Sequence, residues 1–213
     1  MSVKLLDTGG TNELKIDADH GALRASLQPE NFLGHYQVGA TSGLITVLAA
    51  NAPVFSFRNL AANLIIVKRI SIGFSTTTAF TTAQALAWDL LFARSFTVSD
   101  SAGTAIVVTG NQNKVRTSFV APTSIDMRIS ATAALTAGTR TLDTVAMAVG
   151  NGGVTAVVGS VVPIFDIWRH DASDHPLVLA QNEGLVIQNK IVMGVAGVGN
   201  LHVNVEFGEV AAY

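Results

Sequence analysis

The 213-residue chain contains no cysteine. It therefore has no disulfide framework, no thiol nucleophile and no cysteine ligands for a zinc site. The absence of cysteine neither requires an oxidising compartment nor excludes one. The length suits one β-sandwich or barrel domain, with or without an additional arm.

Charged side chains are also scarce. Asp, Glu, Lys and Arg make up 13% of the residues, about half of the ~25% that is usual for soluble domains. Hydrophobic residues reach 49%, yet the very apolar stretch 43–57 is interrupted by Asn51 and Pro53. It is also shorter than the ~20 residues of a membrane-spanning helix. Such a chain has to cover apolar surface in its core and against neighbouring subunits, so we expect a component of an assembly.

The net charge of −2 gives the chain no electrostatic attraction for nucleic acid or anionic lipid. The basic residues are dispersed and do not alternate with aromatic residues, as they do in nucleic-acid-binding grooves. Residues 1–10 do not have a signal-peptide pattern, because Leu5 and Leu6 are followed at once by Asp7. We therefore expect neither nucleic acid nor a membrane among the partners.

Motifs of common enzyme classes are missing as well. The chain has no Gly-x-Ser-x-Gly sequence and no phosphate-binding Gly-Lys-Ser or Gly-Lys-Thr. The glycines of 194–199 have the wrong order for a dinucleotide-binding loop, and a strand pattern follows them. These observations predict a protein that is not an enzyme and has no cofactor.

The composition changes near residue 33. Residues 1–33 contain scattered charges, single apolar residues, the pair Gly9–Gly10 and Pro29. This pattern predicts an extended N-terminal arm, which in an assembly would lie on a neighbour. Residues 34–213 are predicted to form one domain.

The sequence of 34–213 predicts a series of strands separated by polar turns. The clearest alternation of apolar and polar residues is in 201–207, and a second is in 125–130. In 64–74, Leu64, Ile66, Ile70 and Ile72 are predicted to share one face, with Ile65 and Val67 on the other and part of the strand buried on both sides. Turns are predicted at 100–103, 109–113, 150–153 and 197–200. About nine or ten strands result, enough for two packed antiparallel sheets.

The segment 82–96 is open to two interpretations. Leu86, Leu90 and Ala93 follow helical spacing, whereas a period of two places Leu86, Trp88, Leu90 and Phe92 on one face. We favour a strand because the surrounding segments are all β.

One local cluster has side chains that could bind a metal. His170, Asp171, Asp174 and His175 could supply nitrogen and oxygen ligands to a divalent ion. The alternative, which we favour, is a polar loop whose Asp and Ser side chains bond nearby backbone groups. No metal site is therefore assigned.

Other candidates are weaker. Asp17, Asp19 and His20 resemble half of a calcium loop, but they lack the glycine and the bidentate glutamate of an EF-hand. Asp166, Glu183 and Glu206 are carboxylates that a glycosidase could use. A triad assembled from distant serine, histidine and acidic residues stays open.

Two long segments carry a resemblance to a known group of proteins. Residues 34–57 (GHYQVGATSGLITVLAANAPVFSF) and 175–210 (HPLVLAQNEGLVIQNKIVMGVAGVGNLHVNVEFGEV) resemble parts of β-rich structural proteins of tailed bacteriophages. The segments 93–100 and 137–140 add to it. The resemblance covers about half of the chain and rests on phrases of sequence, not on a catalytic motif.

This resemblance implies a virion protein with a jelly-roll-like β-sandwich that forms a homo-oligomer, a trimer in particular. It would decorate or cement a phage capsid, with the major capsid protein as a partner that the arm contacts, and would be made in the host cytoplasm. The alternatives are a tail or fibre component, or a β-sandwich module that binds a carbohydrate or a receptor.

Overall fold

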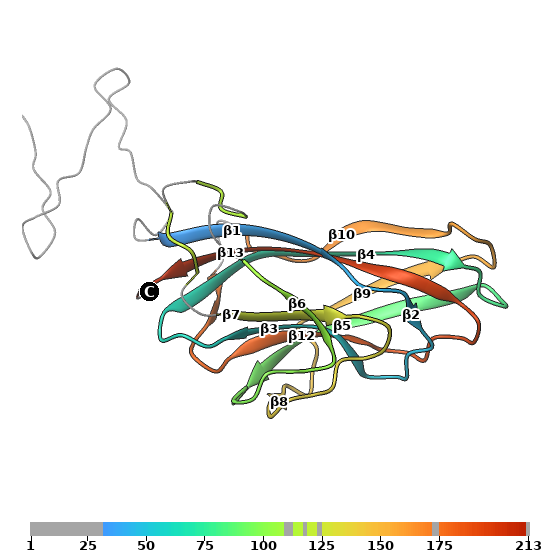
Figure 1. The fold of residues 1–213 in the computed structure, drawn as a ribbon, viewed down its shortest axis with the longest axis horizontal. Coiled ribbons are helices and arrows are strands. Elements are labelled where there is room, and N and C mark those ends of the chain that lie inside the picture. Colours follow the sequence, from blue (N-terminus) through green and yellow to red (C-terminus); the bar gives the residue numbers. More distant parts are fainter. Residues whose placement is uncertain (1–31, 109–112, 117–118, 123–124, 172–174, 212–213) are drawn as a thin grey trace, which may run out of the picture. The chain divides into compact units, whose positions relative to one another are not determined.

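The computed structural model describes residues 32–108, 113–116, 119–122, 125–171 and 175–211. The predicted arm, 1–33, lies outside these residues except for Phe32 and Leu33, which begin the first strand. All regular secondary structure in the described part is β-strand (Figure 1). None of these residues belongs to a helix that could span a membrane.

The strands form two antiparallel sheets. The six-stranded sheet has the order β1-β13-β4-β10, with β2 beside β13 and β11 beside β4. Its strands are β1 (Phe32–Thr41), β2 (Ile45–Thr46), β4 (Leu64–Thr78), β10 (Val161–Arg169), β11 (Leu177–Leu179) and β13 (Val198–Val210).

The seven-stranded sheet has the order β6-β7-β3-β12-β5-β8, with β9 beside β5. Its strands are β3 (Ala52–Asn59), β5 (Gln84–Arg94), β6 (Gly103–Ile106), β7 (Ile125–Ser130), β8 (Thr141–Leu142), β9 (Ala148–Val154) and β12 (Gly184–Asn189).

Strands from the two ends of the domain pair in a nested way. β1 pairs with β13, β3 with β12, β4 with β10, and β5 with β9. Two facing sheets with this order are a jelly roll built from two Greek keys. The predicted all-β, antiparallel, jelly-roll-like β-sandwich is confirmed.

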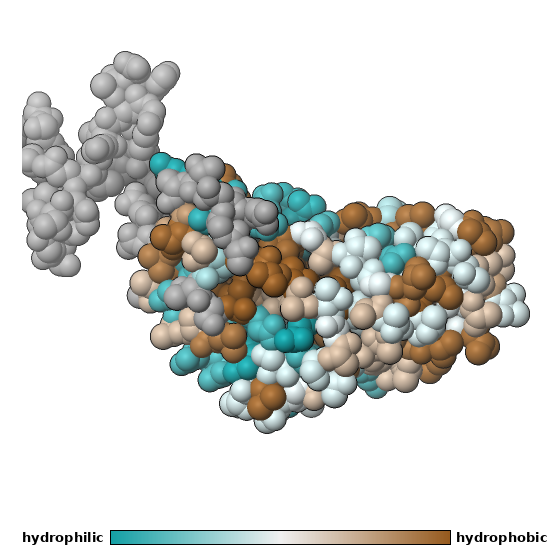
Figure 2. Space-filling view, in the orientation of Figure 1, coloured by the Kyte–Doolittle hydropathy of each residue, from teal (hydrophilic) through white to brown (hydrophobic). Residues whose placement is uncertain are grey.

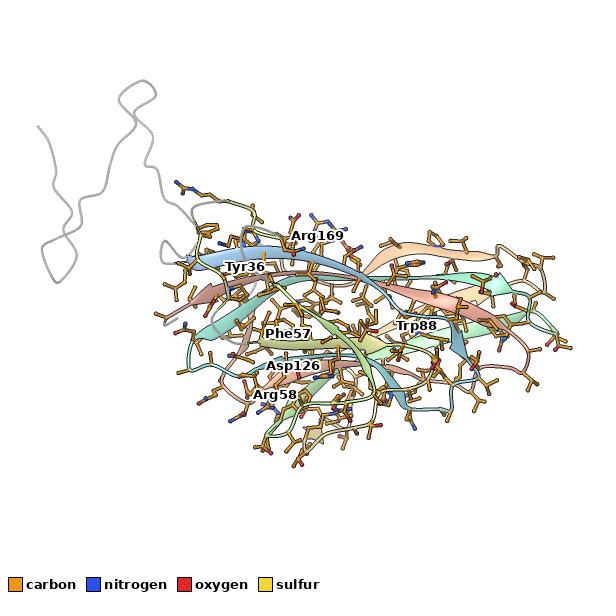
Figure 3. All side chains as sticks on the ribbon, viewed as in Figure 1. Tyr36, Phe57, Arg58, Trp88, Asp126 and Arg169 are labelled. Atoms are coloured by element: carbon orange, nitrogen blue, oxygen red, sulfur yellow. The ribbon has the colours of Figure 1, made fainter. Side chains whose placement is uncertain are left out.

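Aromatic side chains fill the space between the sheets (Figure 3). Phe207 of β13 meets Phe57 of β3 with 5.1 Å between ring centroids, and Phe74 of β4 meets Trp88 of β5 at 6.3 Å. Tilted rings at these separations attract beyond the burial of their area. The two pairs therefore join the sheets at two places along their length.

Two strand predictions are confirmed in detail. In β13, Leu201, Val203, Val205 and Phe207 all belong to the core, as the alternation predicted. In β5, the core takes Leu86, Trp88, Leu90 and Phe92, so the segment is a strand and the helical interpretation is wrong.

The prediction for the faces of β4 is wrong in one respect. Ile65 and Val67 lie in the core, and so do Ile70 and Ile72, although the two pairs were expected on opposite faces. The register shifts because Arg69 pairs with Glu206 and Val67 with Phe207, which leaves Lys68 as an extra residue. A β-bulge of this kind exchanges the faces of the strand beyond it. Ile66 is buried on the opposite face, so burial on both sides is confirmed.

The prediction of a turn at 150–153 is also wrong. These residues lie inside β9, in unbroken register with β5. Gly150 and Gly152 make room for β10, since a Cβ on Gly150 would lie 2.9 Å from the ring of Phe165 and one on Gly152 2.5 Å from a methyl carbon of Val162. The turn at 100–103 is supported by the positive φ of Ala102, whereas the segment predicted as a turn at 197–200 already enters β13 at Val198. Most of 109–113 lies outside the described residues.

Candidate functional site, an uncharged end of the sandwich

Charged side chains are segregated along the sandwich. The four longest segments of the described chain without Asp, Glu, Lys or Arg are 32–57, 70–88, 144–165 and 191–205. The strand pairing brings three of them together, because β13 pairs with the second half of β4, the start of β10 pairs with the same part of β4, and β9 pairs with the first half of β5. Segments that are far apart in the sequence therefore build one part of the molecule without charge.

A boundary of charged residues crosses both sheets. In the six-stranded sheet it is formed by Arg69, which pairs in register with Glu206. In the seven-stranded sheet it is formed by Asp89, whose Oδ2 lies 2.7 Å from Nζ of Lys190. Beyond this boundary lie residues 70–88, β9 and the connections 155–160 and 191–197. We call this part of the sandwich the uncharged end.

The connections at the uncharged end are held by hydrogen bonds. Thr76 N donates to Ser160 O at 2.9 Å, and Thr81 Oγ1 donates to Val195 O at 3.3 Å. Gly194 N donates to Oε1 of Gln84 at 2.7 Å. These bonds attach 155–160 and 191–197 to the residues around the β4–β5 connection. A surface fixed in this way loses little conformational entropy when it is covered.

Apolar side chains are exposed on this end. Val158 is 68% exposed and Val195 72%. In Figure 2 the end where β4, β9 and β10 meet is white, tan and brown, and most of the teal surface lies toward the other end. Exposed apolar surface without charge is typical of the centre of a protein–protein interface. The other exposed large apolar residues near this end are Leu44, Val47, Val149, Val157, Val161, Ile164, Ile191 and Val192.

The sheet edge beside this surface is unprotected. β9 forms the edge of the seven-stranded sheet next to β5, has seven pairs without a bulge, and contains neither a charge nor a proline. The neighbouring edge strand β10 differs, because it has Pro163 and two register shifts. The edge of β1 is covered, since Gln37 N donates to Asn113 O and Val115 N to His35 O. An edge without such devices can pair with a strand from another chain.

The predicted metal candidates fall in the loop between β10 and β11, as expected. His170 donates its backbone N–H to Lys68 O, and its buried Nδ1 has no hydrogen-bond partner within the described residues. Nδ1 of His175 lies 3.1 Å from Pro176 O. Asp174 lies outside the described residues, and Asp171 is exposed. No group of three or more His, Asp or Glu suited to a metal occurs in the part of the chain that is described. The prediction of a polar loop, and the alternative of a metal site, both stay untested.

The candidate carboxylates are divided between the sheets. Asp166 and Glu206 lie on the six-stranded sheet, whereas Glu183 precedes β12 of the other sheet. Burial alone raises the pKa of Asp166, but hydrogen bonds from Ser71 and Arg69 outweigh it, so its pKa lies below the usual value. A glycosidase needs one carboxylic acid with a raised pKa. The pKa of Asp166 is lowered instead, so Asp166 does not suit the role of that acid. The calcium-loop candidates Asp17, Asp19 and His20 lie outside the described residues.

The structure brings together one hydrogen-bonded group that sequence reasoning missed. Nε2 of His202 lies 3.0 Å from Ser75 Oγ, and Nδ1 lies 3.1 Å from Thr41 Oγ1. A serine beside a histidine is the beginning of a hydrolase triad, but here a threonine takes the place of the orienting acid. These three residues come from neighbouring strands of one sheet, and the contacts are those of polar side chains on its outer face.

No protein-family model matches the chain, and no curated protein matches it. The resemblance to phage structural proteins therefore stays a prediction, which these comparisons do not support.

Proposed function

We propose that this protein is a non-enzymatic structural subunit that self-associates through its uncharged end and decorates or stabilises a bacteriophage capsid. The observation that carries the proposal is the uncharged end with its exposed valines, among them Val158 and Val195. Covering this surface removes apolar area from water without removing the hydration of any charged group. Contact with another protein therefore gains from the burial of apolar area and does not lose the hydration of charged groups.

A second copy of the chain is the partner that this surface fits best. The exposed valines of 155–160 and of 191–197 lie on the two connections that flank the β4–β5 connection. One copy can therefore offer the first group to the second group of the next copy. Such head-to-tail contacts form a ring when the rotation between successive copies completes a full turn, and an open filament when it does not. We place three copies in the ring, the number that the resemblance to phage structural proteins implies. Permanent interfaces of this kind are more apolar than transient ones.

Two further observations support a role in a virion. The nested strand order is a jelly roll, an architecture found in viral capsid domains and also in lectins and cupins. Because one fold hosts many functions, the fold alone does not decide among these classes. The segments 34–57 and 175–210 resemble phage structural proteins, and this resemblance favours a virion protein over a lectin or a cupin. Residues 1–33 would contact the major capsid protein.

The proposal is tested first by the mass of the purified chain in solution. Multi-angle light scattering should give three times the 22.2 kDa of one chain, at all concentrations above the dissociation constant of the trimer. A second sample without residues 1–33 should form the same oligomer but bind less to capsids that lack a decorating protein. A full-length chain that stays monomeric at high concentration contradicts self-association. Equal capsid binding by both samples contradicts the role of the arm.

A further inference from the structure

Strands β1, β13 and β4 run side by side in the six-stranded sheet (Figure 1). Residues of these three strands line a depression on the outer face of the sheet. Its volume is about 310 Å³, near the lower limit of the ~300–1,000 Å³ that is usual for ligand sites. It lies at the charge boundary, apart from the surface that we assign to self-association. Its lining consists of Gln37, Val38, Gly39, Arg69, Ser71, Asn204, Val205 and Glu206.

Small residues create the hollow. Gly39 has no side chain, and a Cβ at this position would lie 3.0 Å from Oδ1 of Asn204. Ser71, on β4, is the next small residue across the sheet, since both Gly39 and Ser71 pair with Asn204. The longer side chains of Gln37, Arg69 and Glu206 pair in the adjacent row of the sheet and form one wall.

Two amide side chains of this depression have no partner. Gln37 and Asn204 are exposed, and within the described residues neither side chain forms a hydrogen bond. An amide offers two N–H donors and one carbonyl acceptor. The depression therefore presents both donors and acceptors from two neighbouring strands.

The charges of the depression already have partners. Arg69 Nε lies 2.6 Å from Oδ1 of Asp166, and Oε1 of Glu206 lies 2.9 Å from Nε2 of His35. An anionic ligand would meet the carboxylates of Glu206 and Asp166 beside Arg69, so its charge would gain little here. A neutral ligand with several hydroxyl groups avoids this repulsion, and each hydroxyl donates and accepts and so matches the free amides.

We infer that this depression binds a neutral sugar, one pyranose ring at a time, through the amides of Gln37 and Asn204. The lining holds no aromatic ring on which a sugar could stack, so a single site should be weak, with a dissociation constant on the order of 1 mM. An oligomer that presents several sites would bind a glycan surface ~10²- to 10⁴-fold more tightly than one site does. The tighter binding by an oligomer rests on the proposed function, whereas sugar binding at a single depression does not.

Saturation-transfer difference NMR tests the single site, because this method detects weak ligands in fast exchange. Glucose, galactose, mannose and N-acetylglucosamine are each added at tens of millimolar to the full chain, with N-acetylneuraminic acid as an acidic sugar. At least one neutral sugar should give a signal. The signal should fall at least threefold in Asn204→Ala and in Gln37→Ala. It should be unchanged in Gln181→Ala, which removes an exposed amide that precedes β12 of the other sheet, outside the uncharged end.

Three results overturn the inference: no signal from any neutral sugar, equal signals from Asn204→Ala and the unchanged chain, or a signal from the acidic sugar alone. Each variant is compared with the unchanged chain by its unfolding midpoint, so that a loss of fold is not taken for a loss of binding. The solution mass of the chain is a separate measurement. A monomer that binds a sugar contradicts the proposed function alone, and an oligomer that binds none contradicts this inference alone.

Discussion

The glycines of β9 allow a sharp test of the fold beside the uncharged end. A Cβ on Gly152 would lie 2.5 and 2.7 Å from the two methyl carbons of Val162 and 3.2 Å from its Cβ. Rotation of the stiff valine side chain does not remove all three contacts. Gly152→Ala should therefore separate β9 from β10 and destabilise the protein by about 1–3 kcal/mol, the usual cost of overpacking.

Gly153→Ala is the matched control in the next position of the same strand. A Cβ there meets nothing within 4 Å. The loss of backbone freedom in the unfolded chain should make this variant more stable by about 0.4–1 kcal/mol. If 150–153 were instead a tight turn with positive φ, alanine would be strained at this position as well, by about 1–2 kcal/mol.

Urea unfolding measured by tryptophan fluorescence separates these cases, because Trp88 is buried and pairs with Gly150 of β9. All samples are compared at one protein concentration, since self-association adds to the apparent stability. The midpoint should fall for Gly152→Ala and stay equal or rise for Gly153→Ala, without a change in slope. Equal midpoints for the two variants refute the packing of Val162 against β9.

Two further predictions concern ionisable groups. Arg140→Met removes the ion-pair partner of Asp100, whose side chain is 0% exposed. This change should lower the free energy of unfolding in urea by about 3–5 kcal/mol, and adding Asp100→Asn should restore most of the loss. No recovery in the double variant contradicts an unpaired Asp100 carboxylate as the cause. Burial, then Lys68, holds the pKa of His35 below 6.5. The unfolded chain therefore binds this proton more readily, and stability should fall as the pH drops below 6.5. Between about pH 7 and about pH 5, His35→Gln should lose less stability than the unchanged chain, and parallel curves contradict the assignment.

Alternation along single strands could be predicted from the sequence because it depends only on neighbouring residues. The core residues of β13 and of β5 were found in this way, since an extended chain points successive side chains to opposite faces. The bulge at Lys68 could not be found, because it depends on how β4 pairs with β13. The sequence of 150–153 is equally compatible with a turn. The packing of Phe165 and Val162 explains Gly150 and Gly152, and this packing cannot be read from the sequence.

The candidate site was predictable only in part. The low content of charged residues indicated exposed apolar surface, and the charge-free segments can be read directly from the sequence. Their meeting at one end follows from the pairing of β4 with β13 and of β5 with β9, which no local pattern specifies. The same holds for Gln37 and Asn204, which become neighbours only when β1 pairs with β13.

The proposed self-association places the contact between copies of the chain at the uncharged end. Val158→Lys with Val195→Lys places two cations at the uncharged end, whereas Val107→Lys with Val98→Lys places two on exposed valines outside it. Val158 and Val107 are both 68% exposed, so these two changes are matched in the folded subunit.

Sedimentation velocity of the two double variants and of the unchanged chain gives the decisive comparison. A buried lysine without a partner opposes association strongly, so the first variant should sediment as a folded monomer. The second should sediment as the unchanged oligomer does. An oligomer that survives in the first variant, or that is lost equally in both, contradicts association through the uncharged end.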